Sequence, residues 1–179
     1  MNKDIFIYSP KESIHQDSFS VILAYYLSAA KNKKTLLING KVFSGLGTNK
    51  DKFINPISKL IITNKVNEDK KIFDYVISSK TGTCDGVVNS HIFYILDLNQ
   101  EKNFIEDYKL LIKNKNTFTF VLLNYDKSNI GHSKFVSFLN TNYGINSTIL
   151  EPNDLAYGTY KDLFNGKFYI KKKLIKIFD

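Results

Sequence analysis

The sequence predicts an α/β fold with a mostly parallel central sheet flanked by helices. Its first 38 residues read as strand, helix and strand, which is the pattern of a βαβ unit with a right-handed crossover. Short apolar runs and helical segments continue to alternate along the rest of the chain. A length of 179 residues is enough for one compact domain and short for two. We therefore expect residues 1–179 to form a single domain.

The βαβ unit is predicted from two apolar runs and the helical spacing between them. Residues 5–8 (IFIY) and 35–38 (TLLI) have the length and β-branched content of buried strands. Asp17 or Ser18 is expected to cap the helix at its N-terminus. Apolar residues recur at helical spacing after this cap, at Phe19, Ile22, Leu23, Tyr26 and Leu27.

The remaining elements follow from the same two periodicities. A short helix is expected to begin near Pro56, within residues 54–63. Gly144 is expected to end one of the later helices as its C-cap. Further strands are expected at residues 73–77, 91–98, 118–123 and 148–150, and further helices at residues 103–112, 133–139 and 156–164.

The composition restricts the chemistry that the chain can perform. All 25 basic residues are lysines, and the net charge is +8. Without arginine there is no arginine finger and no guanidinium fork for phosphate or guanine. Cys84 is the only cysteine, so no intrachain disulfide can form. No signal peptide opens the chain and no apolar stretch approaches the ~20 residues of a membrane span, so a cytoplasmic protein is expected.

The order of motifs resembles the ParA/MinD superfamily of deviant Walker A ATPases, which have a P-loop NTPase fold. The segment SPKESIHQDS lies where that family has its phosphate-binding loop, TLLING resembles its second strand, and FDYVISS resembles its Walker B strand. The last third, which includes VLLNYDKSN, STILEPND and LFNGK, is most similar to the TadZ/CpaE branch. Members of that branch position Tad/Flp-type pilus secretion machines.

The resemblance implies a role for individual positions, and almost every family residue is replaced. Lys11 matches the signature lysine that reaches across the family's dimer, and it is a candidate dimer contact. Glu12, Ser13 and His15 match the three glycines of the loop. Gln16 matches the Walker A lysine, and Asp17 matches the Mg-binding Ser/Thr. Asn39 matches the aspartate after the second strand, and Ser78 matches the Walker B aspartate.

These replacements predict that the nucleotide site is degenerate. Glycines let main-chain N–H groups wrap phosphates, and a Cβ obstructs that wrapping. Glutamine cannot neutralise phosphate charge as lysine does, and Asp17 adds negative charge where phosphate would bind. The three histidines lack neighbours at metal-ligand spacing. We therefore expect no catalytic residue, no metal and no cofactor, whereas ATP with Mg²⁺ belongs only to the alternative function given below.

The lysine-rich tail, GKFYIKKKLIKIFD, offers a candidate contact with a membrane or another anion. Relatives of MinD type end in a basic amphipathic helix that lies on anionic membrane, and four lysines here are candidates for the same contact: Lys171, Lys172, Lys173 and Lys176. The favoured interpretation is instead a last element packed on the core with its lysines in water.

The function predicted from these observations is that of a pseudo-ATPase. It would be a non-catalytic scaffold or positioning protein, forming a homodimer and working with the protein components of a pilus or secretion assembly. The alternative is a divergent, nucleotide-switched partition or conjugation ATPase that binds DNA through its lysines. A third hypothesis is an adaptor held by its tail at the inner face of the membrane.

Overall fold

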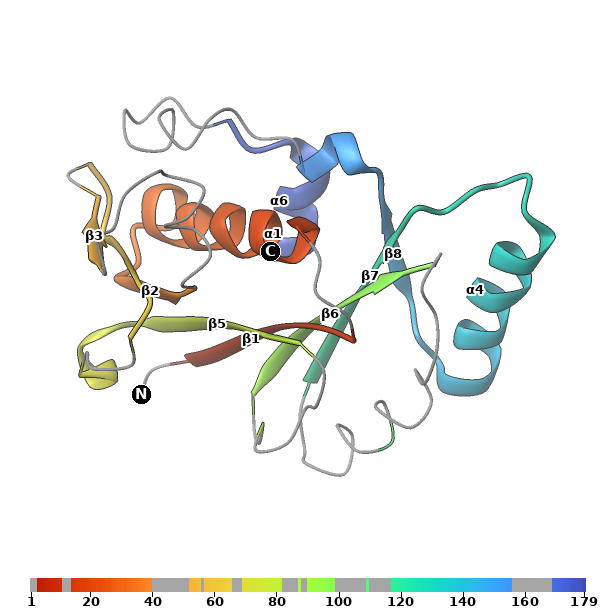
Figure 1. Cartoon of the computed structure of the whole chain (residues 1–179), viewed down its shortest axis with the longest axis horizontal. Coiled ribbons are helices and arrows are strands. Elements are labelled where there is room, and N and C mark those ends of the chain that lie inside the picture. Colours follow the sequence, from red (N-terminus) through yellow and green to blue (C-terminus); the bar gives the residue numbers. More distant parts are fainter. Residues whose placement is uncertain are drawn as a thin grey trace.

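The protein is built around an eight-stranded sheet. The computed structural model describes residues 3–10, 14–39, 52–55, 57–65, 69–81, 87, 90–98, 109, 117–155 and 169–179. The strands are β1 (Lys3–Ser9), β2 (Thr35–Ile38), β3 (Lys52–Ile54), β4 (Leu60–Thr63), β5 (Tyr75–Thr81), β6 (His91–Asp97), β7 (Thr117–Leu123) and β8 (Ser147–Leu150). Their spatial order is β3-β4-β2-β5-β1-β6-β7-β8 (Figure 1). Every pairing is parallel except that of the edge strand β3 with β4.

The described helices vary in type and length. They are α1 (Ile14–Tyr25), the π-helix η1 (Tyr26–Ala30) that continues it, the 3₁₀ turns η2 (Lys70–Ile72) and η3 (Pro152–Leu155), α4 (Ile130–Tyr143) and α6 (Lys172–Phe178). None of the helices in the described part of the chain has the length and apolar character needed to cross a membrane.

The two faces of the sheet carry separate hydrophobic clusters. On one face, α1, η1 and α6 pack over inward-facing residues such as Ile7, Leu37 and Ile77. On the opposite face, one cluster joins β1, β6 and β7 to Leu139 of α4, and a smaller one contains Leu36 and its neighbours. Figure 1 shows α1 and α6 on one side of the sheet and α4 beside β8. The alternation along each strand thus decides which side chains face α1.

The fold class expected from the sequence is confirmed, because the sheet is mostly parallel and helices cover it. The short helix expected near Pro56 is wrong, since residues 52–54 and 60–63 form strands β3 and β4. The run Leu60–Thr63 (LIIT) is rich in β-branched residues, which favour a pleated surface over a helix. Pro56 itself lies outside the described residues.

Helix ends were predicted with mixed success. Gly144 caps α4 in the left-handed conformation, with φ of 63°, and this prediction is confirmed. The expected N-cap of α1 is wrong, because the helix begins at Ile14 and so includes Asp17 in its first turn. The helices expected at residues 103–112 and 156–164 lie outside the described residues, apart from Lys109, which is helical. The extent of the domain over residues 1–179 stays a prediction.

Candidate functional site

The candidate site lies where β1, β2 and β5 end and α1 begins. In the sheet, β1 has β5 on one side and β6 on the other, and the chain crosses from β1 over β5 to β2. The strand order therefore diverges at β1. In open parallel sheets, ligands bind outside the carboxyl ends of the strands at such a switch point. Several residues singled out from the sequence meet at this edge.

Gln16, which the resemblance matches to the Walker A lysine, turns back onto the sheet. Its side chain is only 2% exposed. The amide Nε2 donates a hydrogen bond of 2.7 Å to the main-chain oxygen of Ile7 on β1. This amide is therefore used to tie the first turn of α1 to β1. It also carries no charge with which to hold a phosphate.

Asp17 and Asn39 are brought together, although 22 positions separate them in the sequence. The Nδ2 group of Asn39 lies 2.8 Å from Asp17 Oδ1 and 3.2 Å from the hydroxyl oxygen of Ser20. The Ser20 hydroxyl in turn donates to the main-chain oxygen of Asp17 at 2.8 Å. The main-chain N–H of Asn39 donates to the main-chain oxygen of Thr63 at 2.9 Å, which continues the hydrogen bonding between β2 and β4 beyond the end of β2. A local polar network thus connects α1 to the end of β2.

The carboxylate of Asp17 takes the place where an anion is favoured. The first turn of a helix carries a partial positive charge that stabilises negative groups. Burial raises the pKa of the Asp17 carboxyl above its ordinary value of 3.8, and the hydrogen bond from Asn39 offsets part of this increase. Asp17 was expected to cap the helix, but its carboxylate accepts a hydrogen bond from the Asn39 side chain.

Two neighbouring serines on β5 face opposite sides of the sheet. Ile77 belongs to the cluster beneath α1, and Val76 belongs to the opposite cluster. By this alternation Ser78, the residue matched to the Walker B aspartate, faces away from α1, and Ser79 faces toward it. Ser79 is paired in register with Ile7 of β1. Its buried hydroxyl has no hydrogen-bond partner among the described residues.

Ser79 was missed by sequence reasoning, although a signal for it was present. Counting two positions on from the apolar Ile77 along a strand identifies the next residue on the same face. His15 lies in the first turn of α1 and is half-buried. The other loop positions predicted for the site, Lys11, Glu12 and Ser13, lie outside the described residues.

A second polar group lies at the same edge of the sheet, where β6 and β7 end. Asn124 follows β7 with φ of 57°, a left-handed conformation that asparagine tolerates better than most residues. Its Nδ2 group donates to Asp97 Oδ1 at 2.9 Å. Nearby, the main-chain N–H of Asp126 donates to His132 Nδ1 at 3.0 Å. None of these residues was predicted from the sequence to belong to a site.

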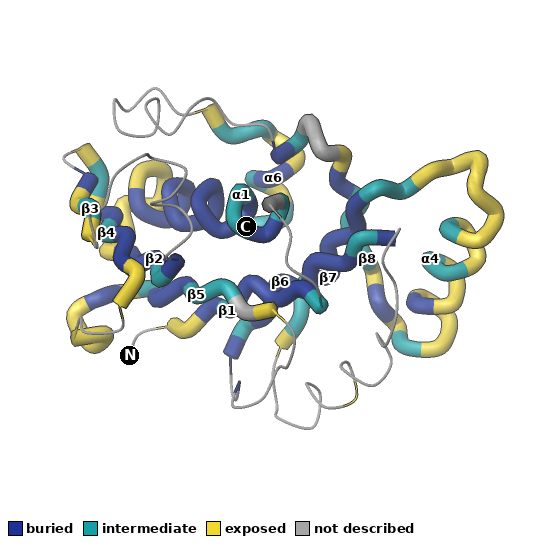
Figure 2. Tube along the Cα trace, viewed as in Figure 1, coloured by how far each residue is buried: buried dark blue, intermediate teal, exposed yellow. Residues whose placement is uncertain are grey.

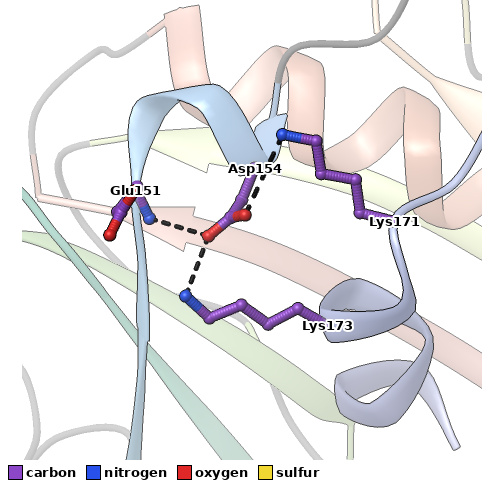
Figure 3. A network of polar contacts seen from close by, with 4 residues as sticks. All are labelled: Glu151, Asp154, Lys171 and Lys173. Carbon is purple, nitrogen blue, oxygen red and sulfur yellow. Dashed lines mark hydrogen bonds and ion pairs between the residues drawn. The ribbon is translucent and has the colours of Figure 1, made fainter.

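Two of the four candidate tail lysines form ion pairs with Asp154 of η3 (Figure 3). Lys173 Nζ lies 2.9 Å from Asp154 Oδ2, and Lys171 Nζ lies 4.0 Å from Oδ1. Burial acts to raise the pKa of Asp154, but hydrogen bonds from Lys173 and from the main chain of Glu151 bring that pKa below its ordinary value. Lys172 and Lys176 are exposed, and their contact with a membrane or anion stays a prediction.

The apolar side of the tail packs on the core, as the favoured interpretation of the sequence predicted. Leu174 is 1% exposed within the cluster beneath α1. The ring of Phe178 lies between three aromatic residues, with centroid distances of 5.4 Å to Phe19, 5.4 Å to Tyr26 and 6.2 Å to Phe93. This side of α6 is therefore engaged within the protein.

The described residues do not fit a bound Mg-ATP. Phosphate binding at this fold's loop needs a cation for the β- and γ-phosphates and oxygen ligands for Mg²⁺. Here Gln16 supplies a neutral amide bonded to β1 in place of that cation, and the Asp17 carboxylate, although an oxygen ligand, is hydrogen-bonded to Asn39. Within the described ranges, no three His, Cys, Asp or Glu side chains are grouped to hold a metal ion.

Two solved structures share this fold. A plasmid partition protein from Borrelia burgdorferi aligns with 99% of this chain and 97% of its own, at 18% identity and a TM-score of 0.58. A candidate plasmid partition protein from Borrelia burgdorferi B31, bound to AMPPNP, aligns with 99% of this chain and 98% of its own, at 17% identity and a TM-score of 0.55. No family model and no curated protein matches the sequence. The likeness establishes a ParA-like P-loop NTPase fold.

Proposed function

We propose that this chain is a pseudo-ATPase, a non-catalytic scaffold or positioning protein with a ParA-like fold. The observation that carries the proposal is a pair of separate hydrogen bonds at the carboxyl edge of the sheet, from Gln16 to the main chain of Ile7 and from Asn39 to Asp17. The positions of Gln16, Asp17 and Asn39 would hold nucleotide and Mg²⁺ in the resembled family. Here their polar groups are bound within the protein.

The chemistry of phosphoryl transfer supports the same conclusion. Catalysis of that reaction is mostly positioning and neutralisation of charge on the transferred group. Gln16 offers no positive charge, and Asp17 repels a phosphate at close range. One structural neighbour was solved with AMPPNP, so the fold itself accommodates a nucleotide analogue in that protein. The proposal for this chain therefore rests on its side chains and not on its fold.

The proposed setting is the assembly or placement of a larger machine. The similarity of the last third to the TadZ/CpaE branch supports a pilus or secretion apparatus as that machine. The two structural neighbours are named for plasmid partition. A homodimer with Lys11 at its contact, and protein components of the machine as partners, belong to the same proposal.

Calorimetry together with light scattering tests the proposal directly. Purified protein would be titrated with Mg-ATP and with Mg-ADP, and its mass would be measured by light scattering on the same sample. We expect no heat of binding and a stable dimer. A partition ATPase with an intact phosphate-binding loop, titrated in parallel, controls for the conditions. Micromolar binding of Mg-ATP followed by turnover would contradict the proposal.

The alternative function makes a different prediction for DNA. A nucleotide-switched partition or conjugation ATPase should bind DNA only with Mg-ATP, and its affinity should fall steeply as salt is raised. Filter binding with and without Mg-ATP distinguishes the two functions. The setting is tested by purifying the tagged protein from its source organism and identifying what accompanies it. Recovery of plasmid partition components without pilus or secretion components would replace the proposed setting.

A further inference from the structure

The edge of the sheet opposite the candidate site is a continuous surface. Strands β4, β2, β5 and β1 are parallel neighbours, so their first residues lie side by side. The turns before them are joined by main-chain hydrogen bonds, from Thr35 N to Lys59 O at 2.9 Å and from Lys3 N to Asp74 O at 2.9 Å. We call these turns and strand starts the amino edge. They lie at the left of Figure 2.

Lysines dominate the charge of the amino edge. Seven described lysines outnumber the four aspartates that accompany them, of which Asp69 and Asp74 accept hydrogen bonds from main-chain N–H groups and Asp179 pairs with Lys31 at 2.7 Å. The fourth is Asp4, on the second residue of β1. The described lysines of this edge, all exposed, are Lys3, Lys31, Lys33, Lys34, Lys59, Lys70 and Lys71. Positive charge is therefore in excess along this edge.

Isoleucine side chains stand out from the same edge. Ile57 is 66% exposed and shares its turn with Lys59, and Ile72 is 50% exposed and follows Lys71. At the corner of the sheet, Ile54 is 60% exposed. The turn bearing Ile57 is fixed by Asn55, whose Oδ1 accepts hydrogen bonds from the N–H groups of Ile57 and Ser58 at 2.9 and 3.1 Å. The fold thus holds these apolar side chains outward.

The spacing lets the lysines act together. Four strands at ~4.8 Å spacing extend over about 15 Å, so neighbouring charges lie within roughly one Debye length of about 8 Å at physiological salt. Basic residues near an anionic bilayer attract it together, and apolar side chains beside them gain free energy by entering the boundary between headgroups and acyl chains. We infer that the amino edge is a docking surface for an anionic lipid membrane.

A nucleic acid fits the described surface less well. The chain has no arginine, the residue best suited to bidentate contacts with phosphate and guanine. Bases of single strands stack on exposed aromatic rings, but Phe73, which lies before β5, is only 3% exposed and sits below Lys34 at 5.5 Å. Protruding isoleucines add nothing to binding a hydrated phosphate backbone. The apolar part of the edge therefore favours lipid.

This surface differs from the one that the sequence suggested for membrane contact. The apolar side of α6 packs on the core, whereas the apolar side chains of the amino edge are exposed. Docking by the amino edge would leave the carboxyl ends of the parallel strands, with Gln16 and Asp17, facing away from the bilayer. The inference goes beyond the proposed function, because it depends on neither nucleotide binding nor its absence.

Co-sedimentation with vesicles tests the inference. The full chain would be mixed with phosphatidylcholine vesicles that contain or lack phosphatidylglycerol, at physiological salt. Wild type should sediment only with the anionic vesicles. Replacing two edge lysines (Lys33→Gln with Lys71→Gln) should weaken partitioning about 25-fold, since each lysine near the surface contributes about fivefold. Ile57→Ser with Ile72→Ser should weaken it about tenfold or more.

A control variant with two lysines replaced elsewhere distinguishes an effect of the amino edge from an effect of net charge. Lys127 and Lys134 are exposed beside and on α4, away from the amino edge, and Lys127→Gln with Lys134→Gln changes the net charge equally. This pair should alter partitioning by no more than about twofold. Circular dichroism and urea unfolding would verify that every variant is folded.

Several results would overturn the inference. If wild type does not sediment with anionic vesicles at physiological salt, the amino edge is not a membrane-docking surface. If the two double-lysine variants lose partitioning equally, the effect is due to net charge and not to the amino edge. Full partitioning of the isoleucine variant would remove the apolar contact on which the choice of lipid rests. Binding of short duplex DNA that depends on Lys33 and Lys71, without vesicle binding, would assign the edge to nucleic acid.

Discussion

The side-chain amide of Asn39 joins the residue after β2 to the first turn of α1, because its Nδ2 lies 2.8 Å from the carboxylate of Asp17. The same nitrogen lies 3.2 Å from Ser20 Oγ, and Asn39 is 6% exposed. A buried donor shared by two acceptors stabilises the fold, and removing it leaves those acceptors without that donor. The relationship ties the stability of the protein to the positions at which the resembled family holds nucleotide.

Asn39→Ala should lower the free energy of unfolding by about 1–3 kcal/mol, the usual cost of leaving buried polar groups unpaired. Urea unfolding followed by circular dichroism measures this change. Asn140→Ala is the matched control, because Asn140 Nδ2 donates to Asn146 Oδ1 at 2.9 Å on the exposed surface. That control should cost no more than about 0.5 kcal/mol. Equal losses in the two variants would show that the Asn39 network contributes nothing special.

Asp17→Asn should change how stability depends on pH. Burial raises the pKa of Asp17, so the folded protein holds this proton more tightly than the unfolded chain does. Its contribution to stability is fully present below pH 3.8 and is lost as pH rises through the higher folded value. The variant does not titrate there and keeps an oxygen acceptor for Asn39, so it should gain stability relative to wild type as pH rises toward neutrality.

Urea unfolding of both proteins over a series of pH values checks this prediction. Titration of all other groups is common to the two proteins and cancels in the difference between their free energies of unfolding. A difference that stays constant with pH, or that changes in the opposite direction, would contradict a raised pKa at Asp17.

Much of this arrangement follows from the sequence, and the physical reason is local. The strand, helix and strand of the first 38 residues are encoded by side-chain periodicity, and a βαβ unit necessarily brings the start of its helix near the ends of its strands. Gln16, Asp17 and Asn39 could therefore be predicted to lie together. The direction of their hydrogen bonds could not, because it depends on how deeply α1 packs against β1 and β2.

Features that depend on strand register and on distant pairing were harder to predict. A shift of one residue moves a side chain to the other face of a sheet, so the sequence motif led to Ser78 and the fold places Ser79 beneath α1. The run Leu60–Thr63 has the β-branched content of a strand, but its pairing with β2 is fixed only by the fold. The lysines of the amino edge are scattered in sequence and meet only because four parallel strands begin together.

Ser79→Ala should leave stability unchanged or raise it by up to about 1 kcal/mol. The Ser79 hydroxyl is buried without a hydrogen-bond partner among the described residues, so its removal deletes a desolvated polar group. Ser20→Ala is the contrasting variant, since the Ser20 hydroxyl donates to Asp17 O and accepts from Asn39. It should cost about 1 kcal/mol in the same urea assay. A loss at Ser79 as large as that at Ser20 would reveal a partner beyond the described residues.

Phe178→Ala should destabilise the protein without weakening its contact with membranes. The ring packs against Phe19, Tyr26 and Phe93, so its loss should lower the free energy of unfolding by about 2–3 kcal/mol, less than for a fully buried ring. Vesicle partitioning of the folded variant should equal that of wild type, because the ring faces the core. A normal stability with reduced partitioning would instead support the tail as a membrane anchor.

Gln16→Lys should destabilise the protein and fail to create nucleotide binding. The side chain at this position is 2% exposed and reaches a main-chain oxygen of β1, so an ammonium there would be desolvated, at a cost of about 3 kcal/mol. Asp17 would still place a carboxylate at the start of α1 and hold Asn39. Calorimetry with Mg-ATP should show no binding heat, and urea unfolding should show the loss of stability.

Gln16→Met controls for the lost hydrogen bond without adding charge, and it should lower the free energy of unfolding by about 1–2 kcal/mol. Micromolar binding of Mg-ATP by Gln16→Lys would contradict this prediction. It would mean that Gln16 alone prevents nucleotide binding in the wild type, and that the hydrogen bond between Asp17 and Asn39 leaves room for a phosphate.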